Sequence, residues 1–235
     1  MDTLKKAKKI TVKFFLNQLL EPATNDKGKE AYPLYIQVTY NRKNMQLKSK
    51  YAEYYYDLKE VKPGLMEFEE RILQKIVTHE KSETKGEYDL KGLKRKYEVY
   101  SLSIHEAVED YLKPKLRLAI LKTNDELTGV LNFTAPQATT ALLHKGARRL
   151  FPDFDRYLGA KLQTELAAYE QYRQLYKEPF FTYTFPAIID WVDGSYRGEL
   201  YKKLNAVYKN NPGAIKGIVA LIEHAVTEKL RQLGE

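Results

Sequence analysis

The chain has 235 residues, enough for one domain or two and for a substantial hydrophobic core. It contains no cysteine, which excludes disulfides and thiolate chemistry, and its four histidines are too widely separated to suggest a metal site. No apolar run approaches the length of a membrane span, and the first residues lack the apolar stretch of a secretory signal. We therefore expect a cytoplasmic protein with no metal or other cofactor.

The net charge of +8 is concentrated at the start of the chain. Residues 1–51 carry 11 Lys and Arg against 4 Asp and Glu, whereas residues 52–122 carry 14 of each and residues 123–235 carry 14 against 13. Localised positive charge is expected of a surface that binds phosphate groups. Lysines on an exposed sheet also prevent edge-to-edge pairing of strands, so the charge alone leaves both interpretations open.

Three segments near the start, residues 8–20, 32–40 and 44–51, alternate apolar and polar side chains as half-buried strands do. The apolar face is predicted to hold Ile10, Val12, Phe14, Leu16, Leu34, Ile36, Val38, Tyr40, Met45, Leu47 and Tyr51. The polar face is predicted to hold Thr11, Lys13, Asn17, Tyr35, Gln37, Thr39, Gln46, Lys48 and Lys50. The turn-forming residues 41–44 predict a hairpin loop between the second and third strands.

Flanking segments of this sheet are predicted to be irregular or to pack against it. A basic arm with Lys5, Lys6, Lys8 and Lys9 precedes the first strand, and residues 21–31 predict a loop to the second. The tyrosines at positions 51 and 54–56 could stack on nucleotides, but packing at the rim of the sheet is the more frequent role of such residues.

The remainder of the chain has mostly helical periodicity. Helices are predicted over residues 65–81, 89–122, 137–151, 154–177, 188–192, 196–211 and 212–233, and a strand over 180–185. Pro114 should kink or restart the second helix, Pro212 fits the first position of the last, and Trp191 should lie in the core. A change of composition over residues 123–136 places the domain boundary there, giving domains 1–122 and 123–235. The fold class is α+β, with a small three-stranded antiparallel sheet followed by helices.

The first half of the chain resembles the N-terminal arm-binding region of tyrosine recombinases from mobile elements, especially the Bacteroidetes type. The resemblance is carried by ITVKFFL at residues 10–16, NDKG at 25–28, YPLYIQVTYN at 32–41 and the basic strand that ends at Tyr51. In that family a small three-stranded sheet with a helix reads DNA, and a helical core-binding domain and a catalytic domain follow. The resemblance therefore implies a DNA-holding sheet at the start of this chain.

The catalytic residues of that family are not recognisable here. Recombinase chemistry uses a tyrosine nucleophile and several cations that neutralise the transition state, including a His-x-x-Arg pair. No histidine in this chain has arginine three residues later; His144 precedes Arg148 by four. GxGxxG, P-loop and HExxH patterns are also absent from the sequence. We therefore expect no enzymatic activity.

The sequence thus predicts a non-catalytic protein that places a basic sheet face on duplex DNA. The residues expected to contact phosphates are Lys13, Arg42, Lys43, Lys48 and Lys50, and those expected to contact base edges are Gln37, Thr39 and Gln46. The alternative is a structural or protein-interaction module whose sheet edge meets a partner and whose helical half forms an oligomer. An exposed apolar patch on the helical half would favour that alternative.

Overall fold

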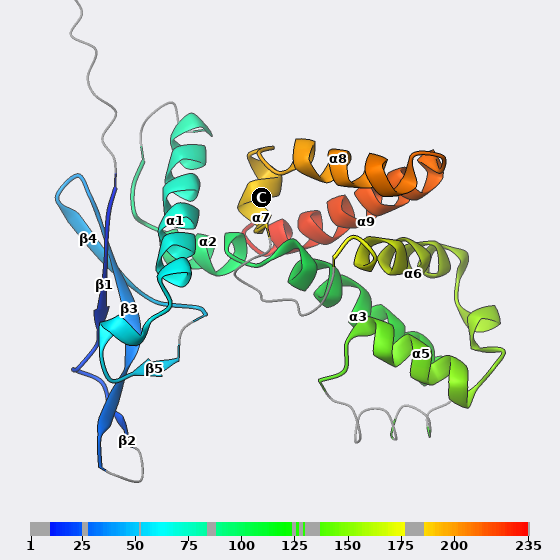
Figure 1. Cartoon of the computed structure of the whole chain (residues 1–235), viewed down its shortest axis with the longest axis horizontal. Coiled ribbons are helices and arrows are strands. Elements are labelled where there is room, and N and C mark those ends of the chain that lie inside the picture. The colour runs from blue at the N-terminus through cyan, green and yellow to red at the C-terminus, as the bar shows by residue number, and fades with distance from the viewer. Residues whose placement is uncertain are drawn as a thin grey trace, which may run out of the picture. The chain divides into compact units, whose positions relative to one another are not determined.

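The computed structural model describes residues 10–24, 28–51, 53–83, 88–123, 126, 129, 137–176 and 186–234 (Figure 1). The chain divides into two compact units, Met1–Ser101 and Leu102–Glu235. The domain boundary expected from composition, after residue 122, lies later in the chain than this division after Ser101. The predicted basic arm and the predicted strand at residues 180–185 fall outside the described residues.

Unit 1 contains the predicted antiparallel sheet. β3 (Glu30–Tyr40) lies between β1 (Thr11–Leu16) and β4 (Lys43–Lys48), and pairs with both in antiparallel register. Two short strands, β2 (Ala23–Thr24) and β5 (Tyr54–Tyr55), pair with the first residues of β3. Because helices make up the rest of the described elements, the predicted α+β class with an N-terminal antiparallel sheet is confirmed.

One face of this sheet, which we call the inner face, forms the core of unit 1. The register aligns Val12 with Val38 and Met45, and it aligns Phe14 with Ile36 and Leu47. Leu34, Ile36, Val38 and Leu47 are buried completely or almost so. The predicted apolar face is therefore the one that packs inward, as period-two alternation requires.

Helices of unit 1 cover the inner face (Figure 1). They are η1 (Leu58–Glu60), α1 (Pro63–Glu83) and α2 (Leu93–Tyr100). On α1, Phe68 packs edge-on against the ring of Tyr51, and the ammonium of Lys81 lies 4.5 Å from the centre of the Tyr40 ring. Tyr40 belongs to the inner face, so α1 stands on that side of the sheet.

A two-residue turn connects β3 to β4. Asn41 and Arg42 have φ angles of 49° and 63°, the left-handed values that a type I′ hairpin turn requires at both central positions. The predicted loop of four residues is shorter in the structure, because Lys43 and Asn44 already pair with Tyr40 and Thr39.

Unit 2 is helical in its described part. Its elements are α3 (Ile104–Thr123), α5 (Thr140–Leu150), η2 (Phe154–Tyr157), α6 (Ala160–Arg173), α7 (Ile188–Val192), α8 (Arg197–Tyr208) and α9 (Pro212–Arg231). α9 packs against α3, α6 and α8 (Figure 1). Trp191 is 2 % exposed and Pro212 occupies the start of α9, which confirms both predictions.

The long helix predicted over residues 89–122 is divided. α2 ends at Tyr100, and α3 begins after Ser103, whose hydroxyl accepts a bond from the backbone N–H of Glu106 while the Glu106 carboxylate accepts the Ser103 N–H. This reciprocal pair is a capping box, a start signal for a new helix. α3 continues through Pro114 instead of restarting there. Within the described ranges no helix has both the length and the apolar character needed to cross a membrane.

Candidate nucleic-acid interface

The second face of the sheet, the outer face, carries three rows of side chains that run across β1, β3 and β4. The register of the strands defines these rows as Thr11–Thr39–Asn44, Lys13–Gln37–Gln46 and Phe15–Tyr35–Lys48. In an antiparallel sheet, residues directly opposite each other have Cβ atoms about 5 Å apart, so each row is a set of neighbours. The sequence predicted seven of these nine residues, all but Phe15 and Asn44, but not which residues stand side by side.

Five of the eight predicted contact residues therefore lie together. Lys13, Gln46 and Lys48 are exposed on the edge strands, while Gln37 and Thr39 are half-buried on the central strand. The Thr39 hydroxyl donates to Asn44 Oδ1 at 2.7 Å, which ties β3 to β4 across the first row. The two glutamine amides occupy adjacent positions in the second row, with Lys13 beside them.

The other three predicted contact residues lie elsewhere. Arg42 is in the turn at the end of the sheet. Lys43 pairs with Tyr40, so it belongs to the inner side, where its ammonium lies 3.6 Å from Asp89 Oδ2. Lys50 follows the end of β4, and its ammonium contacts the hydroxyl and the ring of Tyr51.

Aromatic side chains complete the outer face, and one of them, Phe15, was not among the residues predicted for it. The rings of Phe15 and Tyr35 have centroids 6.0 Å apart and planes inclined by 47°, next to Lys48 in the third row. Because side chains alternate along a strand, Phe14 points inward and Phe15 outward. The Phe-Phe pair in the first strand was therefore the sequence signal that could have assigned Phe15 to the outer face. Half-buried rings on a polar face offer apolar contact to a thymine methyl group or a nucleotide base.

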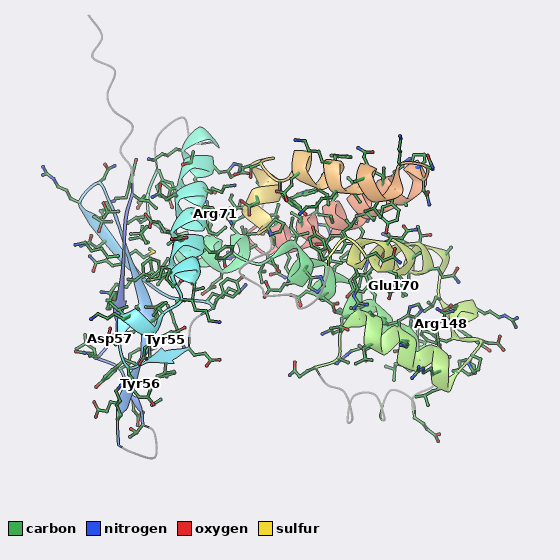
Figure 2. The ribbon with its side chains drawn as sticks, in the orientation of Figure 1. Tyr55, Tyr56, Asp57, Arg71, Arg148 and Glu170 are labelled. Atoms are coloured by element: carbon green, nitrogen blue, oxygen red, sulfur yellow. The ribbon has the colours of Figure 1, made fainter. Side chains whose placement is uncertain are left out.

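Tyr51, Tyr55 and Tyr56, which follow β4, are half-buried and lie outside the rows of the outer face, whereas Tyr54 is exposed. Tyr54 and Tyr55 form β5, and Tyr56 lies where that strand leads towards η1 (Figure 2). The ammonium of Lys29 lies 4.2 Å from the centre of the Tyr56 ring. Tyr51 donates its hydroxyl hydrogen to the backbone carbonyl of Ser101. These contacts agree with the predicted rim packing.

A buried carboxylate fixes the end of β4 to the helices. Glu69 on α1 accepts hydrogen bonds through Oε1 from the Ser49 hydroxyl, the Lys50 N–H and the Tyr97 hydroxyl, while its Oε2 has no hydrogen-bond partner among the described residues. Burial raises the pKa of Glu69, and the three donors partly oppose that rise. Burial, reinforced by Glu69, also raises the pKa of Tyr97, so its hydroxyl stays a donor.

Two further observations bear on the kind of site. Over the described ranges, His, Asp and Glu side chains form no group of three or more that could hold a metal ion. Comparisons with protein families, with curated proteins and with solved structures find no match to this chain. The outer face therefore has to be interpreted from its own chemistry.

Proposed function

We propose that this chain is a nucleic-acid-binding protein, and specifically that it binds duplex DNA in the cytoplasm through the outer face without cutting it. The observation that carries this proposal is the arrangement of cations on both edge strands around amides on the sheet. Lys13 lies on β1 and Lys48 on β4. Gln37 lies on the central strand opposite Lys13, and Gln46 lies on β4 opposite Gln37. The resemblance to integrase arm-binding regions points in the same direction.

The width of the outer face suits a DNA major groove. Strands in a sheet lie about 4.8 Å apart, so β1 and β4 are separated by about 10 Å, whereas the major groove is about 12 Å wide. A sheet of this width can enter the groove with each edge strand next to one phosphate backbone. Lys13 and Lys48 would then contact opposite backbones, and Arg42 would reach a phosphate at the end of the hairpin.

The amides and the hydroxyl would face the base edges. Gln37 and Gln46 can each donate and accept, which is the combination that pairs bidentately with adenine. The Thr39 hydroxyl is hydrogen-bonded to Asn44, and the methyl group and oxygen of Thr39 would face the bases beside the two amides. Phe15 and Tyr35 supply apolar contact beside Lys48. In this proposal the cations supply affinity, and the centre of the face supplies sequence preference.

Charge reversal on the outer face tests the proposal. We expect Lys13→Glu with Lys48→Glu to weaken binding to random duplex DNA and to reduce the slope of log K against log salt by about 2, because each lost phosphate contact removes about one unit. A salt-titrated gel-shift assay measures both quantities. The matched control is Lys59→Glu with Lys62→Glu, which reverses two exposed cations of unit 1 outside the outer face. Equal loss in both double variants would reject the assignment to this face.

The alternative function, a protein-interaction module, has one observation in its favour. An apolar hollow of about 360 Å³ lies between α8 and α9, lined by Tyr201, Pro212, Ile215, Lys216, Val219 and Ala220. An oligomer formed through this hollow would have a mass that is a multiple of 27.4 kDa by size exclusion with light scattering. An oligomer with no affinity for DNA at low salt would favour this second function.

A further inference from the structure

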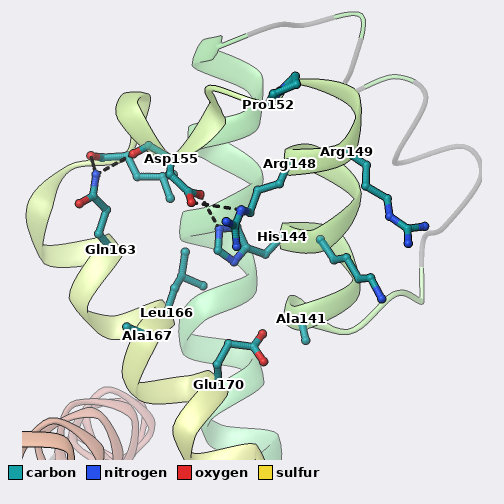
Figure 3. A pocket seen from close by; sticks show the side chains of 12 residues that line it. Ala141, His144, Arg148, Arg149, Pro152, Asp155, Gln163, Leu166, Ala167 and Glu170 are labelled. Carbon is teal, nitrogen blue, oxygen red and sulfur yellow. Dashed lines mark hydrogen bonds and ion pairs between the residues drawn. The ribbon is translucent and has the colours of Figure 1, made fainter.

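A second site lies in unit 2, in a cavity of about 740 Å³ that we call the α5–α6 pocket. Its walls come from α5, from the turn that contains η2, and from α6 (Figure 3). Small-molecule sites in proteins are typically hollows of about 300–1,000 Å³. The volume therefore matches a ligand of nucleotide size.

The α5 wall of the pocket is cationic. Lys145, Arg148 and Arg149 line it, together with His144. Figure 3 shows His144 and Arg148 directed towards Asp155, with His144 Nε2 2.9 Å from Asp155 Oδ1 and Arg148 Nε 3.1 Å from Asp155 Oδ2. Asp155 therefore neutralises Arg148 and fixes its side chain.

Two cations of this wall remain uncompensated. Lys145 and Arg149 are exposed and form no ion pair within the described part of the chain. Figure 3 shows Arg149 directed away from Asp155. The pair supplies two positive charges, which is the complement of a phosphate monoester at neutral pH.

The floor and far end of the pocket have a different character. Leu158 and Leu166, both almost fully buried, form an apolar floor with Ala141 and Ala167. Glu170 stands at the far end, on α6, and its carboxylate also contacts Arg173 at 3.7 Å. An anionic group at the α5 end, an apolar ring over the floor and a hydrogen-bond donor near Glu170 would match these surfaces.

We propose that the α5–α6 pocket binds a phosphorylated small molecule that carries an apolar ring, the chemistry of a nucleoside phosphate. Two features favour a compact ligand over a nucleic-acid strand. The site is concave, and its lining includes the carboxylate of Glu170, which would repel the successive phosphates of a polyanion. This inference is independent of the function proposed for the sheet.

Calorimetric titration of the full chain at low salt tests the proposal with four probes. They are adenosine monophosphate, adenosine, ribose 5-phosphate and inorganic phosphate. We expect the nucleotide to bind at least about tenfold more tightly than any of the other three, because only the nucleotide engages both the cations and the floor. Equal affinity for the nucleotide and inorganic phosphate, or no binding of any probe, would overturn the proposal.

Variants of the pocket separate its two halves. Lys145→Gln with Arg149→Gln should weaken nucleotide binding by about tenfold or more through loss of charge-assisted contacts. Ala167→Leu, at an exposed position of the floor, should weaken binding of the nucleotide and of adenosine but not of inorganic phosphate. The control, Lys202→Gln with Lys209→Gln, removes two exposed cations of unit 2 that do not line the pocket.

The pattern of these losses decides the outcome. Loss in the pocket variants alone, with circular dichroism unchanged, supports the site. Equal loss in the control variant means that binding follows the general charge of unit 2, which overturns the site. Loss of duplex DNA binding in Lys145→Gln with Arg149→Gln, without any affinity for the nucleotide, would reassign this surface to nucleic acid.

Discussion

Glu69 shows how one side chain supports the outer face without belonging to it. Its carboxylate accepts hydrogen bonds from the end of β4 and from the hydroxyl of Tyr97 on α2, so it connects the sheet to α1 and α2. An ionised carboxylate is costly to bury, which is why burial raises its pKa. The three hydrogen bonds hold the carboxylate in place, and breaking them would leave buried polar groups unpaired.

The raised pKa of Glu69 predicts a pH-dependent stability. The pKa of Glu69 in the folded state lies above the ordinary value of 4.5, so folding favours the protonated form. At neutral pH the ionised carboxylate therefore lowers the free energy of unfolding. This unfavourable contribution disappears as the pH falls through the folded-state pKa towards the ordinary value. The free energy of unfolding should therefore rise in this window relative to Glu69→Gln, which cannot titrate. Denaturant titrations at a series of pH values measure the difference.

A second variant at this position tests the hydrogen bonds. Glu69→Ala removes the acceptor of three buried or half-buried donors, and we expect a loss of about 3 kcal/mol at neutral pH, at about 1 kcal/mol for each bond. Glu69→Gln keeps an oxygen at the same position and should lose much less. Parallel pH profiles of wild type and Glu69→Gln would contradict the assigned role of ionisation.

The two glutamines of the second row should control sequence preference rather than general affinity. We expect Gln37→Ala with Gln46→Ala to cost about 1–3 kcal/mol for each lost bidentate contact on a preferred duplex and nothing on random duplex. The salt slope should stay at its wild-type value, because no phosphate contact is lost. Selection from a random duplex library, followed by gel shifts, identifies the preferred site and measures both effects. A changed slope would mean that these amides contact phosphates.

At the scale of the element, the hairpin between β3 and β4 carries the clearest local strain. Arg42 has a φ of 63°, a region in which a side chain with a Cβ is disfavoured and glycine is not. We expect Arg42→Gly to raise the free energy of unfolding by about 0.5 kcal/mol, because Asn-Gly is the preferred pair for this turn. Chemical denaturation measures the change.

The neighbouring position supplies the control for this prediction. Lys43 is the first residue of β4, where glycine removes side-chain packing and increases the entropy of the unfolded chain. Lys43→Gly should therefore lower stability by about 0.5–1 kcal/mol. A destabilising Arg42→Gly would show that the guanidinium makes a contact worth more than the strain.

The same hairpin explains what the sequence could predict and what it could not. Alternation is a local property, so the faces of β1, β3 and β4 follow from the order of residues alone. Alternation does not fix the length of the turn. The turn has two residues instead of the predicted four, and Lys43 therefore pairs with Tyr40 on the inner side. Lys50 was assigned to the outer face by extending the third strand, but β4 ends at Lys48, and the backbone N–H of Lys50 donates to Glu69.

Helix boundaries show a similar limit. Hydrophobic periodicity predicted a single element over residues 89–122, since the spacing continues across residues 101–103. The Ser103–Glu106 capping box divides it, and that signal stood in the sequence as Ser-x-x-Glu. The α5–α6 pocket could not be predicted in this way, because Asp155 and Glu170 meet the cations of α5 only through the packing of separate elements.

For the whole molecule, the distribution of charge separates the two sites for which we propose binding activities. Most of the excess charge lies in the first 51 residues, which include the outer face, whereas residues 123–235, which include the α5–α6 pocket, are nearly neutral overall. In the proposed function, the long-range electrostatic attraction to DNA would therefore come from unit 1. In unit 2 the cations are effective only locally, within a concave site.

This division predicts that each ligand stabilises its own unit. A ligand at a hundred times its Kd stabilises the state that binds it by about 2.7 kcal/mol, which slows hydrogen exchange through unfolding of that unit on the order of a hundredfold. Duplex DNA should thus protect the amides of β1, β3 and β4, and adenosine monophosphate those of α5 and α6. Lys13→Glu with Lys48→Glu should abolish the first effect and leave the second, and Lys145→Gln with Arg149→Gln should do the reverse. Protection of α5 and α6 by DNA to the same degree as the sheet would show that the outer face is not the whole of the DNA-binding surface.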